Sequence, residues 1–505
     1  MQLDARTMSD GTRLDAAVCI IGAGPAGITV ARAFSGSHRD VLVLESGGPD
    51  SDDRIQELNE GTTTGVPYAG LRSTRHRAIG GASRIWNTPV RGEPGAKYAP
   101  LDRCDFAPGA DGNGGWPFDR SLLEPHYARA QADCGLGPFA WDAADWPGKA
   151  PLPLAHGAVI SRVYQFGTAR QCVARKLGDL QSADNIRICH HATALALELD
   201  GSGRRVTSAL VASAGGARLR VHAPLFVLAA GAIENARLLL VTAEANRVPW
   251  NEDLVGRGFM EHARDHALTL LSASADLFGE AAFYDAHEVD GVTIGGRLAL
   301  ADDAVRALAL PNASVTLLPR VRMTRSAPFG GRQILAALRR LGRQRGPEGY
   351  GWSRSADPAA RFDAFRLILN AEQRPHPENR IVLDRARDVN GVPRAMLHLH
   401  WRAEEQAGIE RLRRGFADAI EHAGLGRVEI QAGVVPDLNA HHHAGTTRMH
   451  ADPRHGVVDG DGRVHGTDNL YVTGASVFPS AGFANPTLTI VAMAIRLADL
   501  LRDER

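Results

Sequence analysis

A glycine motif near the amino terminus constrains the fold of this chain more than any other stretch. A short apolar strand leads into GAGPAG at residues 22–27, and a helix and a second strand follow, the latter ending at Glu45. Gly22 permits the tight turn, Gly24 lets the backbone approach a pyrophosphate, and Gly27 lets helix and strand pack closely. Glu45 lies twenty-one residues beyond Gly24, where an acid accepts from ribose hydroxyls and disfavours a 2′-phosphate. The pattern predicts a dinucleotide-binding parallel sheet; a glycine turn in another α/β unit is the alternative.

A second junction of strand, glycine and helix lies far along the chain. Residues 219–240 read LRVHAPLFVLAAGAIENARLLL, in which an apolar strand meets Ala230 and Gly231 before a helix. The two junctions predict one parallel sheet assembled from separated segments. Near the carboxyl terminus a short strand and a turn-rich loop precede Pro486, which opens a long apolar helix because proline suits the first helical turn. The free N–H groups and positive dipole of that helix start suit an anion or an electron-rich ring edge.

Other segments predict a second, antiparallel sheet. Residues 268–322 alternate in places between apolar and polar side chains, and residues 379–401 form a hairpin around an Asn-Gly turn. A long helix is expected over 404–422. Residues 330–345 predict a short basic amphipathic helix, either a solvated lid or rim helix or one that rests on a membrane or partner. The predicted fold class is α/β, as an α+β composite of two lobes.

Composition excludes several classes of function. The chain has 505 residues with 57 basic and 57 acidic side chains, a balance that gives no reason to expect a nucleic acid or an anionic membrane as partner. Its five cysteines form no C-x-x-C pair, so neither a disulfide framework nor a cysteine metal site is indicated. No signal peptide and no apolar run of membrane-spanning length is recognisable. We therefore expect a cytoplasmic protein with no membrane span.

Six motifs, in order and over nearly the full length, resemble the glucose–methanol–choline (GMC) flavin oxidoreductases. They are GAGPAG with Glu45, IGGASRIWN, LVGRGFMEHA, LAAGAIENARLLL, HAGTTRM and the closing NLYVTGASVFPSAGFANPTLTIVAMAI. The last two look nearest to the pyranose oxidase branch and to bacterial sugar dehydrogenases. The resemblance implies FAD rather than NAD. It also implies an FAD-binding Rossmann-like domain from separated segments and a substrate domain with an antiparallel sheet flanked by helices.

On this basis we assign residues 1–100, 180–262 and 436–505 to the FAD-binding domain, and residues 101–179 and 263–435 to the substrate-binding domain. Within the GMC-like motifs, the residues expected to contact the cofactor are Gly22, Gly24, Pro25, Ala26, Gly27, Glu45, Ser46, Arg77, Gly80, Gly81, Ser83, Asn87, Ala194, Ala230, Gly231, Gly474, Ala475, Asn485, Pro486 and Thr487.

The resemblance also implies the catalytic pair. His442, seven residues before Met449, falls on the family's catalytic base, and Asn485, just before Pro486, falls on its partner. An alcohol releases a hydride only as its O–H proton is removed, so a neutral imidazole can act as general base. An amide can hydrogen-bond the same oxygen and hold the C–H bond toward flavin N5. The helix that starts at Pro486 could stabilise the charge gained near flavin N1.

Other roles for these residues stay open. His441, His442 and His443 could form a metal cluster with histidines further along, but adjacent side chains on an extended chain point to opposite faces. No acidic or cysteine ligand lies at helix spacing, so no metal is predicted. Asn485 could cap the helix at Pro486, a role compatible with catalysis. Gln373 and His441 are candidates for contact with a sugar substrate.

One position departs from the pyranose oxidase pattern. A histidine of the GG-x-S-x-H-W segment carries the flavin covalently in that branch, and here the position is Ile85. Isoleucine cannot form such a bond, so we expect FAD to be bound without a covalent link.

The leading functional hypothesis is oxidation of a secondary hydroxyl of a sugar or glycoside to a ketone, with oxygen or another compound as electron acceptor. A close variant oxidises a primary CH₂OH to an aldehyde, as family members in aminoglycoside pathways do. A GMC-like hydroxynitrile lyase, in which FAD is structural, is a second class, and its flavin would stay oxidised with every alcohol. A flavin monooxygenase is a third, and it would consume NAD(P)H.

Overall fold

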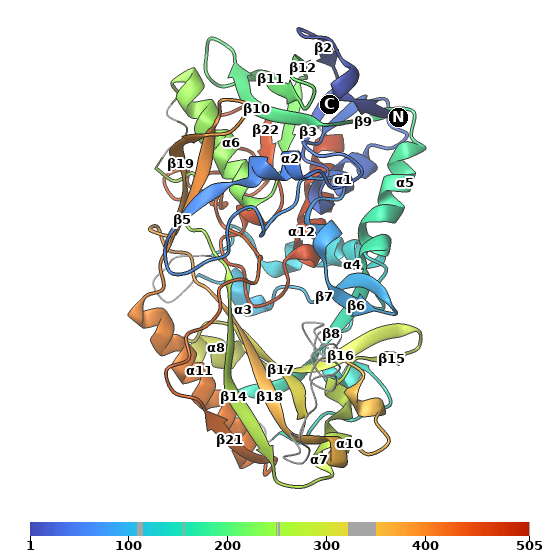
Figure 1. Cartoon of the computed structure of the whole chain (residues 1–505), viewed down its shortest axis with the longest axis vertical. Helices are drawn as coiled ribbons and strands as arrows, with labels where there is room; N and C mark the ends of the chain where they lie inside the picture. Colours follow the sequence, from blue (N-terminus) through green and yellow to red (C-terminus); the bar gives the residue numbers. More distant parts are fainter. Residues whose placement is uncertain (109–114, 155–156, 249, 251–252, 322–349, 504–505) are drawn as a thin grey trace, which may run out of the picture.

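The computed structural model describes residues 1–505 except 109–114, 155–156, 249, 251–252, 322–349 and 504–505. Two lobes follow one another along the longest axis of the molecule, and both chain termini lie in the same lobe (Figure 1). That lobe contains a six-stranded parallel sheet. Its strands in spatial order are β1 (Gln2–Asp4), β9 (Ile186–His190), β4 (Val41–Leu44), β3 (Val18–Ile21), β13 (Leu225–Leu228) and β22 (Leu470–Val472). The predicted sheet from separated segments is confirmed.

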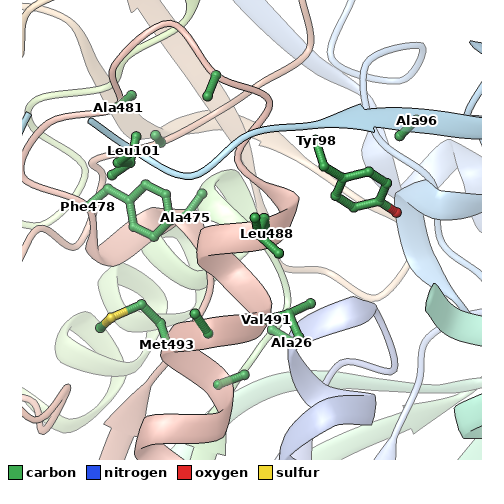
Figure 2. Close-up of a cluster of buried hydrophobic side chains, with 14 of the residues drawn as sticks. Ala26, Ala96, Tyr98, Leu101, Ala475, Phe478, Ala481, Leu488, Val491 and Met493 are labelled. Carbon is green, nitrogen blue, oxygen red and sulfur yellow. The ribbon is translucent and has the colours of Figure 1, made fainter. Parts of the chain in front are cut away.

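Helices cover this sheet because its central strands are apolar on both faces. β3 reads VCII and β4 reads VLVL, and every one of these residues is buried. Figure 2 shows Val491 and Leu488 of the carboxyl-terminal helix beside Ala26 of the first helix. The helices that follow the first and last glycine turns therefore pack on each other. The longer helices of this lobe are α1 (Pro25–Ala33), α5 (Arg175–Gln181), α6 (Ala232–Asn246) and α12 (Thr487–Asp503).

A nine-stranded sheet forms the second lobe, and all of its pairings are antiparallel. In spatial order its strands are β21 (Gly426–Ile430), β14 (His262–Ser272), β18 (Phe362–Glu372), β17 (Ala313–Val321), β16 (Val292–Leu300), β8 (Val159–Thr168), β7 (Glu93–Tyr98) and β6 (Thr88–Val90), with β15 (His287–Val289) on β16. The long helix α11 (Ala403–His422) packs on β14 and β21, as expected. The predicted helix over 330–345 lies outside the described residues.

Smaller elements complete the two lobes. A four-stranded sheet contains β10 (Ala192–Leu199), β11 (Val206–Ser213), β12 (Arg218–His222) and β2 (Arg13–Asp15). The remaining helices are α4 (Glu124–Asp133), which packs on α12, and the shorter α2 (Asp53–Gln56), α3 (Arg103–Phe106), α7 (Leu277–Glu280), α8 (Asp302–Ala307) and α10 (Pro358–Arg361). Among the described residues, no helix combines the length and apolar character needed to cross a bilayer.

Two segments cross the assigned domain boundaries. The hairpin of β19 (Arg380–Arg387) and β20 (Pro393–Leu399) was assigned to the substrate domain, but it pairs with β5 (Gly61–Gly65) and packs on α6 of the other lobe. β6 and β7 were assigned to the FAD-binding domain, but they belong to the nine-stranded sheet. Turn signals locate strands in a sequence, but which sheet a strand joins depends on pairings with distant segments.

Candidate active site

One cavity of about 450 Å³ lies where the two lobes meet. The turns that follow β3, β4, β13 and β22 line it from one lobe, and β7 and β14 line it from the other. Most residues expected to contact the cofactor line this cavity: Gly22, Gly24, Pro25, Ala26, Glu45, Ser46, Arg77, Gly81, Ser83, Asn87, Ala194, Ala230, Gly231, Gly474, Ala475, Asn485, Pro486 and Thr487. Gly27 and Gly80 lie outside the lining.

The GAGPAG turn provides an open cradle at the cavity. Gly22 has φ +110°, and a Cβ there would lie 2.6 Å from the carbonyl oxygen of Ala229. A Cβ on Gly27 would lie 1.9 Å from the carbonyl oxygen of Gly22, so Gly27 serves packing rather than the cavity. A Cβ on Gly24 would meet no protein atom within 4 Å and would point into open space. This space at the start of α1 fits a pyrophosphate.

The segment with Gly80 and Gly81 covers the same turn. Gly80 has φ +101° and donates its N–H to the carbonyl of Ala23 at 2.8 Å. A Cβ on Gly81 would lie 3.0 Å from Cα of Gly24. Gly81 therefore gives the expected close approach, whereas Gly80 fastens the segment to the first turn instead of touching a ligand.

Glu45 lies at the end of β4 with its carboxylate held by the backbone. Its oxygens accept from the N–H groups of Ala23 and Gly47, each at 2.9 Å. Burial raises the pKa of this carboxyl, against the effect of these N–H donors. Each oxygen retains a second lone pair, so the carboxylate can still accept from ribose hydroxyls at the cavity edge.

Arg77, which was expected at the cofactor, belongs to a buried cluster of charged side chains, of which Arg75, Arg77 and Glu234 line the cavity. Glu234 of α6 pairs with Arg75 at 2.8 Å, with Arg77 at 2.8 Å and with Arg237 at 2.7 Å. Arg237 also pairs with Asp388 at 2.7 Å. Burial alone would raise the pKa of Glu234, but the surrounding guanidinium groups hold it below its usual range. Three cations share two carboxylates, and the excess positive charge suits an anionic ligand.

His442 lies in the segment between β21 and β22 and lines the same cavity. Its backbone N–H donates to Glu261 Oε2 at 2.9 Å, and its Nδ1 lies 3.0 Å from Nδ1 of His262. Burial lowers the pKa of His442 well below 6.5, and Arg264 and Lys97 lower it further. The imidazole is therefore neutral at neutral pH, the state that a general base requires.

Asn485 and the start of α12 line the cavity with His442. Ile490 donates its N–H to the carbonyl of Pro486 at 2.9 Å, so the helix begins directly after this proline, as predicted. The first turn of α12, with Thr487, therefore presents its positive dipole end to the cavity.

The three consecutive histidines take separate environments. His441 is exposed, has φ +60° and lines the cavity, so the chain is not extended here and the expected simple alternation of side chains is wrong. His443 Nε2 lies 2.8 Å from the Tyr68 hydroxyl and 3.4 Å from Glu261 Oε1. His465 binds the carbonyl of His450 at 2.9 Å, away from the cavity lining.

Gln373 does not line the cavity. Its side chain accepts the N–H of Glu261 at 3.0 Å and donates to Glu405 at 3.2 Å, and it is only 1% exposed. The expected contact with substrate is therefore corrected, because these bonds make Gln373 a support of the histidine segment.

Glu261 and His262 are among the site residues that the sequence does not predict. Both lie in the LVGRGFMEHA motif, which was used only to recognise the family resemblance. Two adjacent residues with acid–base side chains at the start of a strand are the sequence signal that could have indicated them.

The neutral histidine predicts an unusual pH dependence. Because the pKa of His442 is lowered well below 6.5, kcat/KM should stay constant as the pH falls through 6.5, and should decline only at lower pH. Steady-state assays across this range, with the stability of the protein checked at each pH, measure the effect. An acid limb centred near 6.5 would contradict a desolvated base.

Comparison with known proteins relates the chain to flavin-dependent alcohol oxidases. Residues 375–494 match the family model described as GMC oxidoreductase. The chain is 26% identical to 6'''-hydroxyparomomycin C oxidase of Streptomyces lividus, over 95% of this chain and 90% of the relative. The carboxyl-terminal part of the chain is therefore of the GMC oxidoreductase type, which implies FAD and chemistry on CH–OH groups.

Other similarities place this GMC enzyme more finely. It is 25% identical to paromamine 6'-oxidase of Streptomyces fradiae, over 95% of this chain and 90% of the relative. The large subunit of fructose dehydrogenase from Gluconobacter japonicus is 26% identical, over 63% of this chain and 54% of the relative. The fold matches pyridoxine 4-oxidase from Mesorbium loti with a TM-score of 0.59 at 18% identity, covering 97% of this chain and 99% of that chain. These relatives favour aminoglycoside oxidases over the expected placement beside pyranose oxidase.

Proposed function

We propose that this enzyme oxidises a primary alcohol, CH₂OH, of an aminoglycoside-type sugar substrate to an aldehyde. The observation that carries the proposal is the similarity to 6'''-hydroxyparomomycin C oxidase and paromamine 6'-oxidase, which extends over 95% of this chain. The motifs alone favour a secondary hydroxyl. The primary alcohol takes precedence because the fructose dehydrogenase subunit aligns with a smaller share of the chain. The names of the two Streptomyces relatives favour oxygen as the electron acceptor.

Different residues around the cavity would bind the cofactor and transfer the proton. The GAGPAG turn with the start of α1 would hold the pyrophosphate of FAD, and Glu45 would hold the ribose. When bound, FAD supplies the acceptor for the hydride that leaves the alcohol carbon. His442 receives the O–H proton as a neutral base, and the Asn485 amide can donate to the same oxygen. Both lobes contribute residues to the cavity wall around these groups.

The decisive experiment is anaerobic mixing of the purified flavoprotein with paromamine and with its 6'-deoxy counterpart, which lacks the reacting hydroxyl. We expect the flavin absorption band to bleach with paromamine only. The product should be an aldehyde by mass spectrometry and by reaction with a hydrazine probe. A flavin band that persists with paromamine and with other amino sugars would overturn the proposal.

A secondary hydroxyl oxidised to a ketone is the second candidate, favoured by the similarity to a fructose dehydrogenase subunit. Fructose derivatives and neutral glycosides, all with their primary hydroxyls blocked, separate the two candidates. Bleaching by these compounds, with a ketone product, would favour the second candidate.

Asn485 gives a further prediction about this chemistry. Asn485→Ala should lower the rate of flavin reduction by roughly ten- to a hundredfold, because the alcohol oxygen loses one donor in a desolvated site. Asn485→Asp places an acceptor in the same volume and should be slower still. Stopped-flow reduction of the FAD-loaded variants measures both. If Asn485→Ala loses its flavin instead, the residue serves to build the start of α12.

The mode of FAD attachment is also testable. Ile85 lines the cavity and carries no nucleophilic atom. We propose that FAD is bound without a covalent link, so acid precipitation should release all of the flavin into the supernatant. Absorbance of supernatant and pellet measures the partition, and protein precipitated after addition of free FAD provides the control. Yellow flavin retained by the washed pellet would contradict the proposal.

A further inference from the structure

The ring of His262 lies directly against the ring of His442. Their Nδ1 atoms are 3.0 Å apart, and the ring planes are inclined by 72°. One carboxylate oxygen fixes both backbones, because Glu261 Oε2 accepts from the N–H of His442 at 2.9 Å and from the N–H of His262 at 3.2 Å. Glu261 is itself fully buried and accepts from the Tyr68 hydroxyl at 2.5 Å. The contact between the two rings is therefore built into the site.

This contact decides which nitrogen of His442 can act as a base. A contact of 3.0 Å between two ring nitrogens needs one hydrogen and one lone pair. If His262 donates, the hydrogen of neutral His442 must be on Nε2, and that atom cannot take a proton. If His442 donates from Nδ1, its Nε2 keeps a lone pair. Within the described part of the chain, Nε2 of His442 makes no hydrogen bond, so it is the atom left for a substrate.

The surroundings of His262 favour the second arrangement. Burial lowers the pKa of His262 to about 4, so at neutral pH its ring carries one hydrogen. The carbonyl of Ala481 acts on this ring as an acceptor and opposes that shift. A carbonyl can only accept, and Nδ1 faces His442, so the hydrogen of His262 belongs on Nε2. Nε2 of His262 is buried and makes no hydrogen bond in the described structure, so the Ala481 carbonyl acts on it from outside hydrogen-bond geometry.

The charges at the cavity point the same way. Arg264 and Lys97 line the cavity with His442 and act on its ring. Nearby cations stabilise a lone pair directed into the cavity and destabilise an N–H there. Arg264 Nε is buried without a hydrogen-bond partner in the described structure, so no acceptor offsets the positive charge at that atom.

We propose that His262 is a positioning residue that accepts the Nδ1 hydrogen of His442 and so keeps Nε2 of His442 unprotonated. The substrate O–H proton then moves to Nε2, while the Nδ1 hydrogen remains shared with His262. Glu261 clamps the two histidines by their backbones. The inference rests on the proposed function only in making His442 the base; the tautomer itself is a property of the resting protein.

Two substitutions test the role in catalysis. His262→Leu removes the acceptor, and we expect kcat for substrate oxidation to fall roughly ten- to a hundredfold with little change in KM, because a buried Nδ1–H without a partner favours the other tautomer. His262→Asn places an amide oxygen near the position of Nδ1 and should restore most of the rate. His266→Leu is the matched control, since His266 is an exposed histidine of the same strand β14. Equal losses in the Leu and Asn variants, or no loss in either, would overturn the role.

The tautomer has its own readout. Holoprotein labelled with ¹⁵N-histidine and measured without substrate should give a protonated-type shift at Nδ1 of His442 and an unprotonated-type shift at Nε2. The resonances are assigned by their loss in His442→Gln. His262→Leu should move both shifts toward the Nε2–H form, whereas His262→Asn should not. A wild-type His442 protonated at Nε2 would overturn the proposal even if the Leu variant failed to fold. A confirmed Nδ1–H tautomer in a protein that oxidises no sugar would remove the proposed function and leave this inference standing.

Discussion

His442→Ala should retain FAD and lose the rate of substrate oxidation by about 10²- to 10⁴-fold, the usual contribution of a general base. The imidazole is kept neutral by desolvation, and its Nε2 makes no hydrogen bond in the described structure. Alanine leaves the alcohol proton without an acceptor, so hydride release becomes slow. Anaerobic stopped-flow reduction of the flavin by saturating substrate measures this step directly.

The control and the contradicting result are both available for this prediction. His266→Ala alters an exposed histidine of β14 and should reduce its flavin at the wild-type rate. An unchanged FAD content in His442→Ala shows that the cavity survives the substitution. A rate within threefold of wild type would remove His442 as the base and would direct attention to His443, which lines the same cavity.

Gly24→Val should leave the protein folded but weaken FAD binding on the order of a hundredfold or more, because a side chain would occupy the space of the pyrophosphate. No protein atom lies within 4 Å of a Cβ at Gly24, and its φ of −80° is accessible to any residue. The substitution should therefore leave the stability of the fold unchanged and block the space that the pyrophosphate would occupy. Fluorescence titration of the apoprotein with FAD, together with its melting temperature, separates the two effects.

Two further glycines make this test specific. Gly27→Val should prevent folding, because a Cβ there would lie 1.9 Å from the carbonyl oxygen of Gly22. Gly178→Val is the matched control, since Gly178 also has no atom within 4 Å of its Cβ position but lies exposed on α5. Gly24→Val that binds FAD as tightly as wild type would show that the cofactor phosphate lies elsewhere.

The sequence predicts the parts of the site that depend on the backbone conformation of a few consecutive residues. Gly22, Gly24 and Pro486 need particular backbone geometries, and the chain has the turn and the helix start that these residues indicate. The six motifs also led to His442 and Asn485, which line the same cavity although their roles in catalysis stay predictions.

Contacts between distant segments were not predictable in the same way. Glu234 forms an ion pair with Arg77, 157 residues earlier in the chain. Glu261 accepts a hydrogen bond from the backbone of His442, 181 residues later. Each residue by itself reads as an ordinary charged side chain, and only the folded sheets bring it to its partner. The same cause misplaced Gln373 and the boundary near β7, because both depend on how strands of the two lobes pair.

The parallel sheet joins the two ends of the chain, and this affects how the protein is made. β3 and the GAGPAG turn emerge from the ribosome first, whereas β22, Asn485 and α12 emerge last. α12 packs on α1 and closes the cavity beside Ala26. A nascent chain therefore has no complete pocket until α12 has been synthesised, and cofactor binding follows that step. Before that point α1 lacks the helix that packs on it, so its apolar surface stays open to chaperones.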